Sequence, residues 1–330
     1  MLIVRLLLGL SMLIGSLRWW RLPDTPVPNR QMMYRDTSRL GRPFAKDPHV
    51  IAFGNRYLMY YSIPAGPSAT GWGIGIAESK NLIDWQKVGE VTPDASAPYE
   101  KNGLCAPCAL VKDGRVHLFY QTYGNREKDA ICHAVSANGI TFTRDETNPI
   151  FRPNGAWTCG RAIDAEVIQY KNQYLLYFAT RNPAYTVQMQ GVAAASLNTT
   201  FARNDWKLLA DSSILRPVLP WEKKCVEGAS CLPVGKSLYM FYAGGYNNEP
   251  QQIGVAVSTD AVRWQRLSDE PLLKNGEPGS WNASESGHPH VFKDRKGGVH
   301  LFFQGNSDNG KTWYISQRTI HLANGRWVVD

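Results

Sequence analysis

The sequence predicts an all-β fold, a five-bladed β-propeller with four antiparallel strands in each blade. Two observations carry this prediction. A unit of roughly sixty residues recurs five times along the chain, and each copy reads as four short strands with no helical periodicity between them. A repeat of this length and content is typical of a propeller, in which each sheet packs against its neighbours around a central channel.

Each unit opens with a hairpin made of a short apolar strand, a polar or glycine-containing turn and an aromatic-rich strand. The first hairpin reads "KDPHVIAFGNRYLMYYS" from Lys46, with Gly54-Asn55 as its turn. Its four relatives are "PCALVKDGRVHLFYQT" from Pro107, "AEVIQYKNQYLLYFAT" from Ala165, "ASCLPVGKSLYMFYAG" from Ala229 and "PHVFKDRKGGVHLFFQG" from Pro289. Their even spacing makes the five openings equivalent positions of one repeat.

Two further strands complete each unit. The third strands are small and apolar: "GIGIAES", "AICHAVS", "GVAAAS", "IGVAVS" and "WYISQR". The fourth usually contain an aromatic residue: "DWQKVGEV", "ITFTRD", "DWKLLA", "RWQRLS" and "GRWVVD". We expect the tryptophans of these last segments to pack between blades, namely Trp85, Trp206, Trp264 and Trp327.

The propeller is expected to occupy residues 41–330, after an extended, Pro-rich lead-in over residues 21–40. Residues 1–20 differ in character, because one Arg precedes an apolar stretch from Leu6 to Ile14 and then Gly15 and Ser16. That stretch suits the apolar region of a secretory signal and is too short to span a bilayer. The lack of an A-x-A cleavage pattern leaves an uncleaved membrane anchor as the alternative. We therefore expect an exported protein: periplasmic, secreted or membrane-anchored.

Composition excludes several classes of protein. Hydrophobic residues make up 43% of the chain and aromatics 11%, so a substantial core is expected rather than disorder. The net charge of +8 is dispersed, which argues against a nucleic-acid partner and is compatible with an acidic polysaccharide or with no charged partner. Export would permit disulfides among the six cysteines, in no deducible connectivity. The single C-x-x-C, Cys105 to Cys108, has no second pair at zinc-site spacing, so zinc is not favoured.

The propeller geometry gathers ionisable residues at one end of the channel. The residue before the first strand of each blade lies at the channel mouth, on the same face as the loop between strands two and three. The five equivalent positions are Asp47, Ala106, Asp164, Gly228 with Glu227 directly before it, and His288. Any one of these side chains could simply cap a strand or contact solvent. Three carboxylates and a histidine meeting in one concavity indicate a functional site.

The openings of blades one, three, four and five read "KDPHV", "AIDAEV", "VEGASC" and "SGHPHV". They resemble the motifs of family 43 glycoside hydrolases and of their five-bladed relatives in families 32, 62 and 117, over about residues 40–330. The resemblance implies an enzyme with Asp47 as general base, Asp164 as the residue that tunes and orients, and Glu227 as general acid. It also implies that His288 lies beneath the sugar, where it can hold an axial calcium ion or water. No other cofactor is implied.

Hydrolysis of a glycosidic bond needs an acid on the leaving oxygen and a base that activates water on the opposite face of the ring. Asp47 and Glu227 come from blades one and four, across the channel, which predicts inversion. Glu227 would need a raised pKa, and we expect an ionised Asp164 to raise it by repulsion. The resemblance implies arabinose or xylose linkages by default. A family 117-like anhydro-galactosidase, a glycoside phosphorylase and a non-catalytic glycan-binding propeller are alternatives.

Aromatic and basic residues near the mouth are candidates for sugar binding, since sugar rings stack on aromatic faces. The expected substrate-binding residues are Trp72, Tyr123, Trp157, Arg181, Trp221 and Trp281, together with His288. The three tryptophans that precede blade openings, Trp157, Trp221 and Trp281, serve equally well as packing between blades. Glu166 is a possible second channel carboxylate. Arg42, Arg161 and Arg181 are either plain loop cations or ligands for a carboxylate or phosphate.

Overall fold

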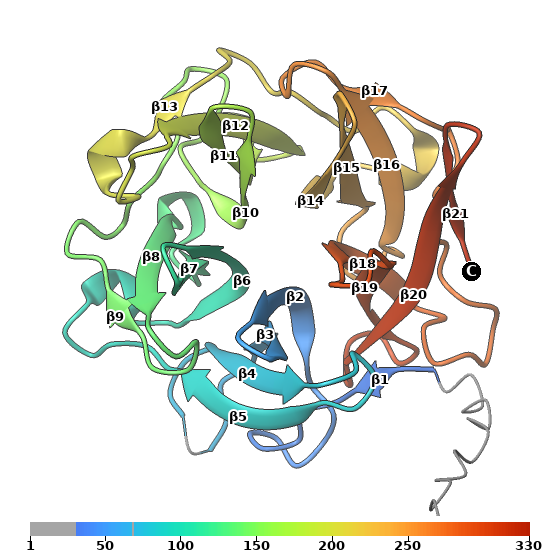
Figure 1. Ribbon diagram of the computed structural model, residues 1–330, viewed down its shortest axis with the longest axis horizontal. Helices are drawn as coiled ribbons and strands as arrows, with labels where there is room; N and C mark the ends of the chain where they lie inside the picture. The colour runs from blue at the N-terminus through green and yellow to red at the C-terminus, as the bar shows by residue number, and fades with distance from the viewer. Residues whose placement is uncertain (1–30, 68) are drawn as a thin grey trace, which may run out of the picture. The chain divides into compact units, whose positions relative to one another are not determined.

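The computed structural model describes residues 31–67 and 69–330, which form five antiparallel sheets arranged in a ring (Figure 1). The prediction of a five-bladed β-propeller is confirmed. The expected signal or anchor at residues 1–20 lies outside the described residues, as does the lead-in up to residue 30. The part of the chain that is described contains no helix of the length and apolarity needed to cross a membrane.

Each blade follows the chain outward from the axis. Blade one is β2 (Lys46–Phe53), β3 (Arg56–Ile63), β4 (Gly73–Ser79) and β5 (Gln86–Val91). Blade two is β6 (Leu104–Lys112), β7 (Arg115–Thr122), β8 (Ile131–Ser136) and β9 (Thr143–Arg144). Blade three is β10 (Ile163–Tyr170), β11 (Gln173–Arg181), β12 (Gln188–Ser196) and β13 (Lys207–Leu208).

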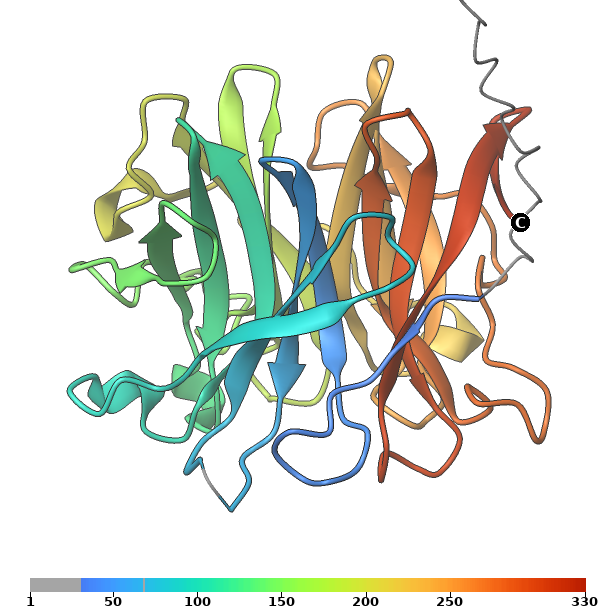
Figure 2. The same ribbon diagram turned by 60° about the horizontal axis from the view of Figure 1, so that its bottom comes forward.

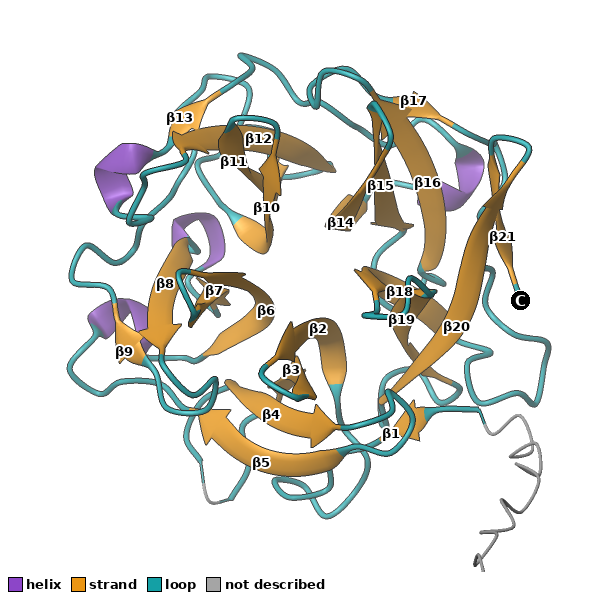
Figure 3. Ribbon diagram, viewed as in Figure 1, coloured by secondary structure: helices purple, strands orange, loops and turns teal. Residues whose placement is uncertain are grey.

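Blade four is β14 (Val226–Val234), β15 (Ser237–Gly244), β16 (Gln252–Ser258) and β17 (Gln265–Arg266). Blade five is β18 (Glu285–Lys293), β19 (Val299–Asn306), β20 (Tyr314–Ala323) and β21 (Arg326–Val329). Within the described residues, helical structure is limited to short 3₁₀ turns in the connections, η1 (Pro98–Glu100), η2 (Arg126–Lys128), η3 (Arg203–Asp205) and η4 (Pro220–Glu222) (Figure 3).

The first strand of every blade lies nearest the axis and the fourth lies at the rim (Figures 1 and 2). The inner strands contact one another in ring order, from β2 through β6, β10, β14 and β18 back to β2. Part of the expected lead-in belongs to the ring, because β1 (Met33–Tyr34) pairs with β20 of the last blade. The compact unit accordingly runs from Gln31 to Asp330.

A β-bulge interrupts the first strand of every blade at the same place. The pairing register with strand two shifts there in all five blades. The residues at the bulge have left-handed φ values: Asp47 51°, Ala106 46°, Asp164 52°, Gly228 56° and His288 44°. These are the five positions that the repeat alignment made equivalent. All five lie inside the first strand of their blade rather than before it. The bulge turns the side chains at these positions toward the channel mouth.

Aromatic residues close the ring between neighbouring blades. Trp85 of blade one packs edge-on against Phe302 of blade five, with ring centroids 6.2 Å apart. Trp264 packs in the same way on Tyr177 of blade three, at 5.8 Å. The remaining pairs are Phe142 on Tyr60, Trp206 on Phe119, and Trp327 on Tyr239 and Phe241. The expectation that the fourth-segment tryptophans pack between blades is confirmed.

A buried acid links strands two and four within several blades. In blade four, Glu222 is fully buried and accepts hydrogen bonds from the Tyr242 hydroxyl at 2.8 Å and from Arg266 at 2.6 and 2.9 Å. In blade two, Glu100 accepts from Tyr120 and Arg144 in the same way. These contacts tie the connecting segment to the sheet that it precedes.

All six cysteines are free thiols, and five of them are buried. The fold therefore forms none of the disulfides that export would permit. Burial raises the pKa of the Cys108 and Cys231 thiols well above their ordinary value, so both are neutral packing groups at neutral pH.

Replacing Glu222 by Ala tests the buried acid. The substitution leaves the Arg266 guanidinium without its carboxylate in a largely dry setting, so unfolding in urea should require about 3–5 kcal/mol less free energy. The exposed pair partner Glu270, whose side chain is 72% accessible, provides the control. Glu270→Ala should change stability by less than about 1 kcal/mol. Equal, small losses in both variants would contradict this account.

Candidate active site

A pocket of about 300 Å³ opens at the end of the channel where the bulges lie. It draws on every blade, through the bulged ends of the first strands and the loops between strands two and three. Its lining residues are Lys46, Asp47, Trp72, Cys105, Ala106, Gln121, Tyr123, Arg161, Ile163, Asp164, Arg181, Gln188, Glu227, Tyr246, Asn247 and His288. The pocket therefore brings together Asp47, Asp164 and Glu227, as the repeat spacing implied.

Three of the five bulges are fixed by a glutamine side chain from the preceding blade. The backbone N–H of Asp47 donates to Gln304 Oε1 at 2.9 Å, and that of Asp164 donates to Gln121 Oε1 at 2.8 Å. The N–H of His288 donates to Gln251 Oε1 at 3.0 Å. A bulged residue loses its ladder partner, so a side-chain acceptor satisfies a donor that would otherwise be buried unpaired.

Asp47 is held in its ionised form. Its Oδ1 lies 3.3 Å from His288 Nδ1 and 4.0 Å from Lys46 Nζ. Burial opposes the charge on Asp47, but the Lys46 cation and the neighbouring His288 lower its pKa below the ordinary value. A buried carboxylate that stays ionised can accept a proton, which suits a base.

Glu227 and Asp164 are neighbouring carboxyl groups with different partners. Glu227 Oε1 accepts from Gln251 Nε2 at 2.6 Å, and Oε2 accepts from the Gln188 amide. Burial and the neighbouring charges of Glu227 and Asp47 raise the pKa of Asp164 well above its ordinary value.

The raised pKa of Asp164 runs against the sequence-based expectation of an ionised Asp164 that keeps Glu227 protonated. The causes are the burial of Asp164 and the neighbouring charges of Glu227 and Asp47. The repeat pattern did not reveal the two glutamine contacts to Glu227.

The remaining expected binding residues divide into two groups. Trp72, Tyr123, Arg181 and His288 line the pocket, and the Trp72 and Tyr123 rings lie 5.0 Å apart at 34°. Trp157, Trp221 and Trp281 are absent from the lining. Each stacks instead on a strand-two ring of its own blade: Trp157 on Phe178, Trp221 on Tyr242 and Trp281 on Phe303. For these three, packing is what the structure shows.

The structure also distinguishes two of the arginines whose role the sequence did not decide. Arg161 lines the pocket and lies 3.5 Å from Asp129 Oδ2. Arg42 lies outside the lining and donates to the Lys311 carbonyl at 2.8 Å.

Sequence reasoning missed Lys46, Gln188 and Gln251. Gln121 and Gln304 had a signal, because both stand near the end of strand two after an aromatic residue, in "FYQT" and "FFQG".

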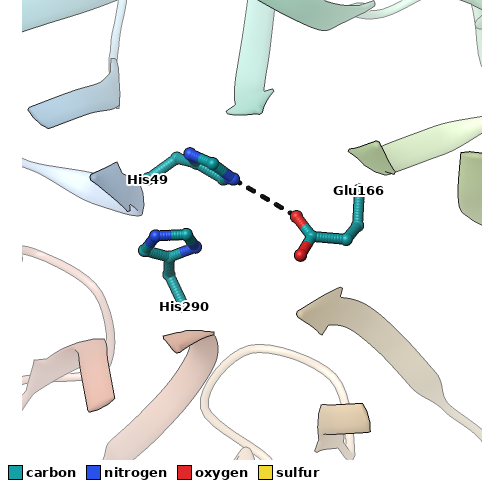
Figure 4. A group of neighbouring side chains, drawn as sticks. All are labelled: His49, Glu166 and His290. Carbon is teal, nitrogen blue, oxygen red and sulfur yellow. Dashed lines mark hydrogen bonds and ion pairs between the residues drawn. The ribbon is translucent and has the colours of Figure 1, made fainter. Parts of the chain in front are cut away.

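Below the pocket, His49, Glu166 and His290 meet near the axis (Figure 4). Their potential ligand atoms all lie within 4.8 Å of one another, and all three residues are buried. This is the place where the described residues come nearest to a metal site. Glu166 thus lies deeper in the channel than Asp164 and does not line the pocket.

The ring nitrogens of the two histidines in this cluster are hydrogen-bonded to protein groups. His49 Nδ1 accepts from the Ala109 N–H at 3.2 Å, so Nε2 carries the ring proton and donates to Glu166 at 3.2 Å. His290 Nε2 donates to the Val50 carbonyl at 3.0 Å. Burial lowers the pKa of both histidines to about 3, so both rings are neutral.

A calcium ion does not fit these residues. Calcium prefers several oxygen ligands, whereas this cluster offers one carboxylate that already accepts four hydrogen bonds. His288, the position expected to hold an axial ion, faces Asp47 and belongs to no cluster with metal-ligand spacing among residues 31–67 and 69–330.

The family model for glycosyl hydrolases family 43 matches residues 40–330. The chain belongs to glycoside hydrolase family 43. It is a glycosidase, and its substrate is a carbohydrate.

Solved structures of family 43 and related enzymes share the fold. A thermostable family-43 glycoside hydrolase superposes with a TM-score of 0.70 at 20% identity, over 87% of this chain and 92% of that one. An endo-1,4-beta-xylanase from Bacteroides thetaiotaomicron gives 0.66 at 20% identity, over 87% and 94%. An alpha-L-arabinofuranosidase from Lactobacillus brevis gives 0.65 at 15%, over 87% and 94%.

Infrared spectroscopy tests the proton position in this family 43 site. At neutral pH, Asp164→Asn should remove one carboxylic-acid C=O band, because the raised pKa of Asp164 favours its protonated form. The matched control Asp47→Asn should leave that band in place, since Asp47 is ionised. A spectrum unchanged by Asp164→Asn would mean that Asp164 is ionised in the resting enzyme.

Proposed function

We propose that the enzyme hydrolyses glycosidic bonds with inversion, with Asp47 as general base, Glu227 as general acid and Asp164 as the proton partner of Glu227. One observation carries the proposal. A single pocket brings together three buried carboxyl groups from blades one, three and four, and their surroundings lower the pKa of Asp47 and raise that of Asp164.

The proton balance of the reaction follows from this arrangement. Asp164 passes its proton to Glu227, and Glu227 donates it to the glycosidic oxygen as the bond to the anomeric carbon breaks. Asp47 takes a proton from the water that attacks the other face of the ring, where the new C–O bond forms. Exchange with solvent then returns Asp47 to its ionised form and restores the proton of the pair.

We take an arabinose- or xylose-containing glycan as the default substrate. Similar structures are named as a xylanase and an arabinofuranosidase, which supports this choice of sugar. The pocket, at about 300 Å³, suits roughly one or two sugar rings. Trp72 and Tyr123 at its edge supply the aromatic platform.

Phosphorolysis is less well supported, since it needs a cluster of free cations around the attacking phosphate. Lys46 is paired with Asp47 and Arg161 with Asp129, which leaves Arg181 as the one lining arginine or lysine without an ion pair in the described residues. A glycan-binding propeller would not need the three buried carboxylates. A family 117-like action on anhydro-galactose stays open as a choice of sugar.

Two carboxylate variants test the roles of acid and base. Asp47→Asn should lower kcat/KM about 10²–10⁴-fold on every glycoside. Glu227→Gln should lower it by a similar factor on natural oligosaccharides but much less on dinitrophenyl glycosides, whose leaving groups need no proton. The measurement is sugar release from arabinosides and xylosides with and without phosphate, with proton NMR of the first-formed anomer.

The exposed variant Glu270→Gln serves as control and should match the wild type. Release that requires phosphate would make the enzyme a phosphorylase. A first-formed product that retains the starting configuration would contradict inversion. Wild-type-like rates in Asp47→Asn would remove Asp47 as the base.

The pH profile tests the cation beside the base. Lys46 contributes to the low pKa of Asp47, so Lys46→Met should raise that pKa. Activity depends on ionised Asp47 and is lost as pH falls through its pKa, so the acid limb of kcat/KM should move to higher pH. Lys236→Met, at an exposed hairpin turn, should leave the limb in place. A limb that stays fixed in Lys46→Met would assign it to another group.

A further inference from the structure

Arg181 is held at the pocket without a counter-charge. It ends β11, and its Nε donates to Gln188 Oε1 at 3.1 Å. Its guanidinium carbon lies 4.3 Å from the ring centre of Tyr185 and 5.3 Å from that of Tyr246. One amide and two aromatic rings thus fix the guanidinium, and none of them neutralises it.

The other two cations of the pocket each have an acidic partner. Lys46 lies 4.0 Å from Asp47, and Arg161 lies 3.5 Å from Asp129. Throughout the part of the chain that the structure describes, no carboxylate oxygen comes within 4.0 Å of Arg181. The terminal nitrogens Nη1 and Nη2 of Arg181 also make no hydrogen bond to the described residues, so both tips keep their N–H groups for a ligand.

The place of Arg181 in the pocket is defined by Gln188. The Gln188 carbonyl oxygen accepts from Arg181, and its amide nitrogen donates to Glu227 Oε2. Arg181 therefore lies on the side of the proposed general acid, where the leaving group of the substrate sits. Asp47, from which water would attack, is on blade one.

We propose that the substrate of this glycosidase carries an anionic group, a carboxylate or a sulfate ester, on a sugar beside the cleaved bond, and that Arg181 binds it. The inference rests on the proposed function, because it names the substrate class of the same pocket. A guanidinium presents paired N–H groups that match the two oxygens of a carboxylate or sulfate, and a charge-assisted pair of this kind is stronger than a neutral hydrogen bond. A neutral glycan would leave the Arg181 charge without a partner in the closed complex.

The proposal places the anion on the acid side and so separates it from phosphorolysis. An attacking phosphate would occupy the position of the water near Asp47. A substrate anion on Arg181 would instead be carried through the reaction unchanged. The dispersed positive charge of the chain, +8 overall, is compatible with a polyanionic glycan.

Binding measurements test the proposal apart from catalysis. The Asp47→Asn protein is titrated by calorimetry with xylo-oligosaccharides that carry a glucuronic acid branch, with the methyl esters of the same compounds, and with a sulfated galactan oligosaccharide beside its desulfated form. We expect the acid or the sulfate to bind at least about tenfold more tightly than its neutral counterpart. The preference should shrink as salt is raised.

Arg181 variants locate the preference. In the Asp47→Asn background, Arg181→Gln should abolish the preference for the anion, and Arg181→Lys should keep part of it because the charge remains without the paired geometry. Arg263→Gln is the matched control, since Arg263 is exposed and paired with Asp260. Circular dichroism of each variant confirms that the fold is intact.

The outcomes distinguish the two levels of the proposal. Equal binding of anionic and neutral glycans, or a preference that survives Arg181→Gln, overturns the anionic substrate and leaves the hydrolase mechanism standing. The glycan could instead bind with anion selectivity that depends on Arg181, while the wild-type enzyme fails to hydrolyse it. That result overturns the proposed hydrolysis and supports the Arg181 site. Tighter binding of the acid than the sulfate, or the reverse, identifies the source of the charge.

Discussion

The bulge in the first strand of each blade is the constraint on which the site depends. A regular strand would turn alternate side chains toward the two neighbouring blades. The bulge adds a residue in a left-handed conformation, which aims one side chain at the channel mouth instead. In Asp47 and Asp164 this conformation is stabilised by a glutamine of the preceding blade, through the backbone N–H that the bulge leaves unpaired. The contact that positions each of these two carboxylates is thus also a contact between blades, so ring closure and site geometry are one requirement.

Electrostatics then gives chemically identical groups different roles. Asp47 and Asp164 have the same φ, the same strand position and similar burial. They differ in neighbours, because Lys46 and His288 face Asp47 whereas Glu227 faces Asp164. The first environment lowers the pKa and the second raises it. One propeller repeat can therefore supply both the base and the proton source of the proposed mechanism.

The sequence was sufficient for features that repeat. Five hairpins at even spacing predicted the blades, and their openings predicted that Asp47, Asp164 and His288 would share one structural position. The fourth-segment tryptophans were predicted to pack between blades for the same reason. What the sequence did not reveal are contacts made once. Gln188 at the start of β12 in blade three and Gln251 just before β16 in blade four both reach Glu227, and nothing in the repeat marks a glutamine as a donor to this carboxylate.

The tryptophans that precede blade openings are a second case that the sequence alone could not decide. Trp157, Trp221 and Trp281 recur at nearly the same distance before each opening, and recurrence alone suits both a sugar platform and a packing residue. Third-strand glycines decide between them in two blades, since a Cβ on Gly191 or Gly254 would come within 2.8 Å of the Trp157 or Trp221 ring. That close approach explains why glycine occupies these two third-strand positions, for which the sequence alone offered no reason.

The glutamine contacts to Glu227 carry a mechanistic consequence. Two amide donors contact Glu227, the residue that donates a proton in the proposed mechanism. In that mechanism the proton moves from Asp164 to Glu227, and a substrate that adds negative charge or excludes water beside Glu227 would favour the transfer. Gln188 also contacts Arg181, so the proposed anion site and the proposed acid share one side chain. Binding of an anionic glycan at Arg181 would then bring the glycosidic oxygen beside Glu227.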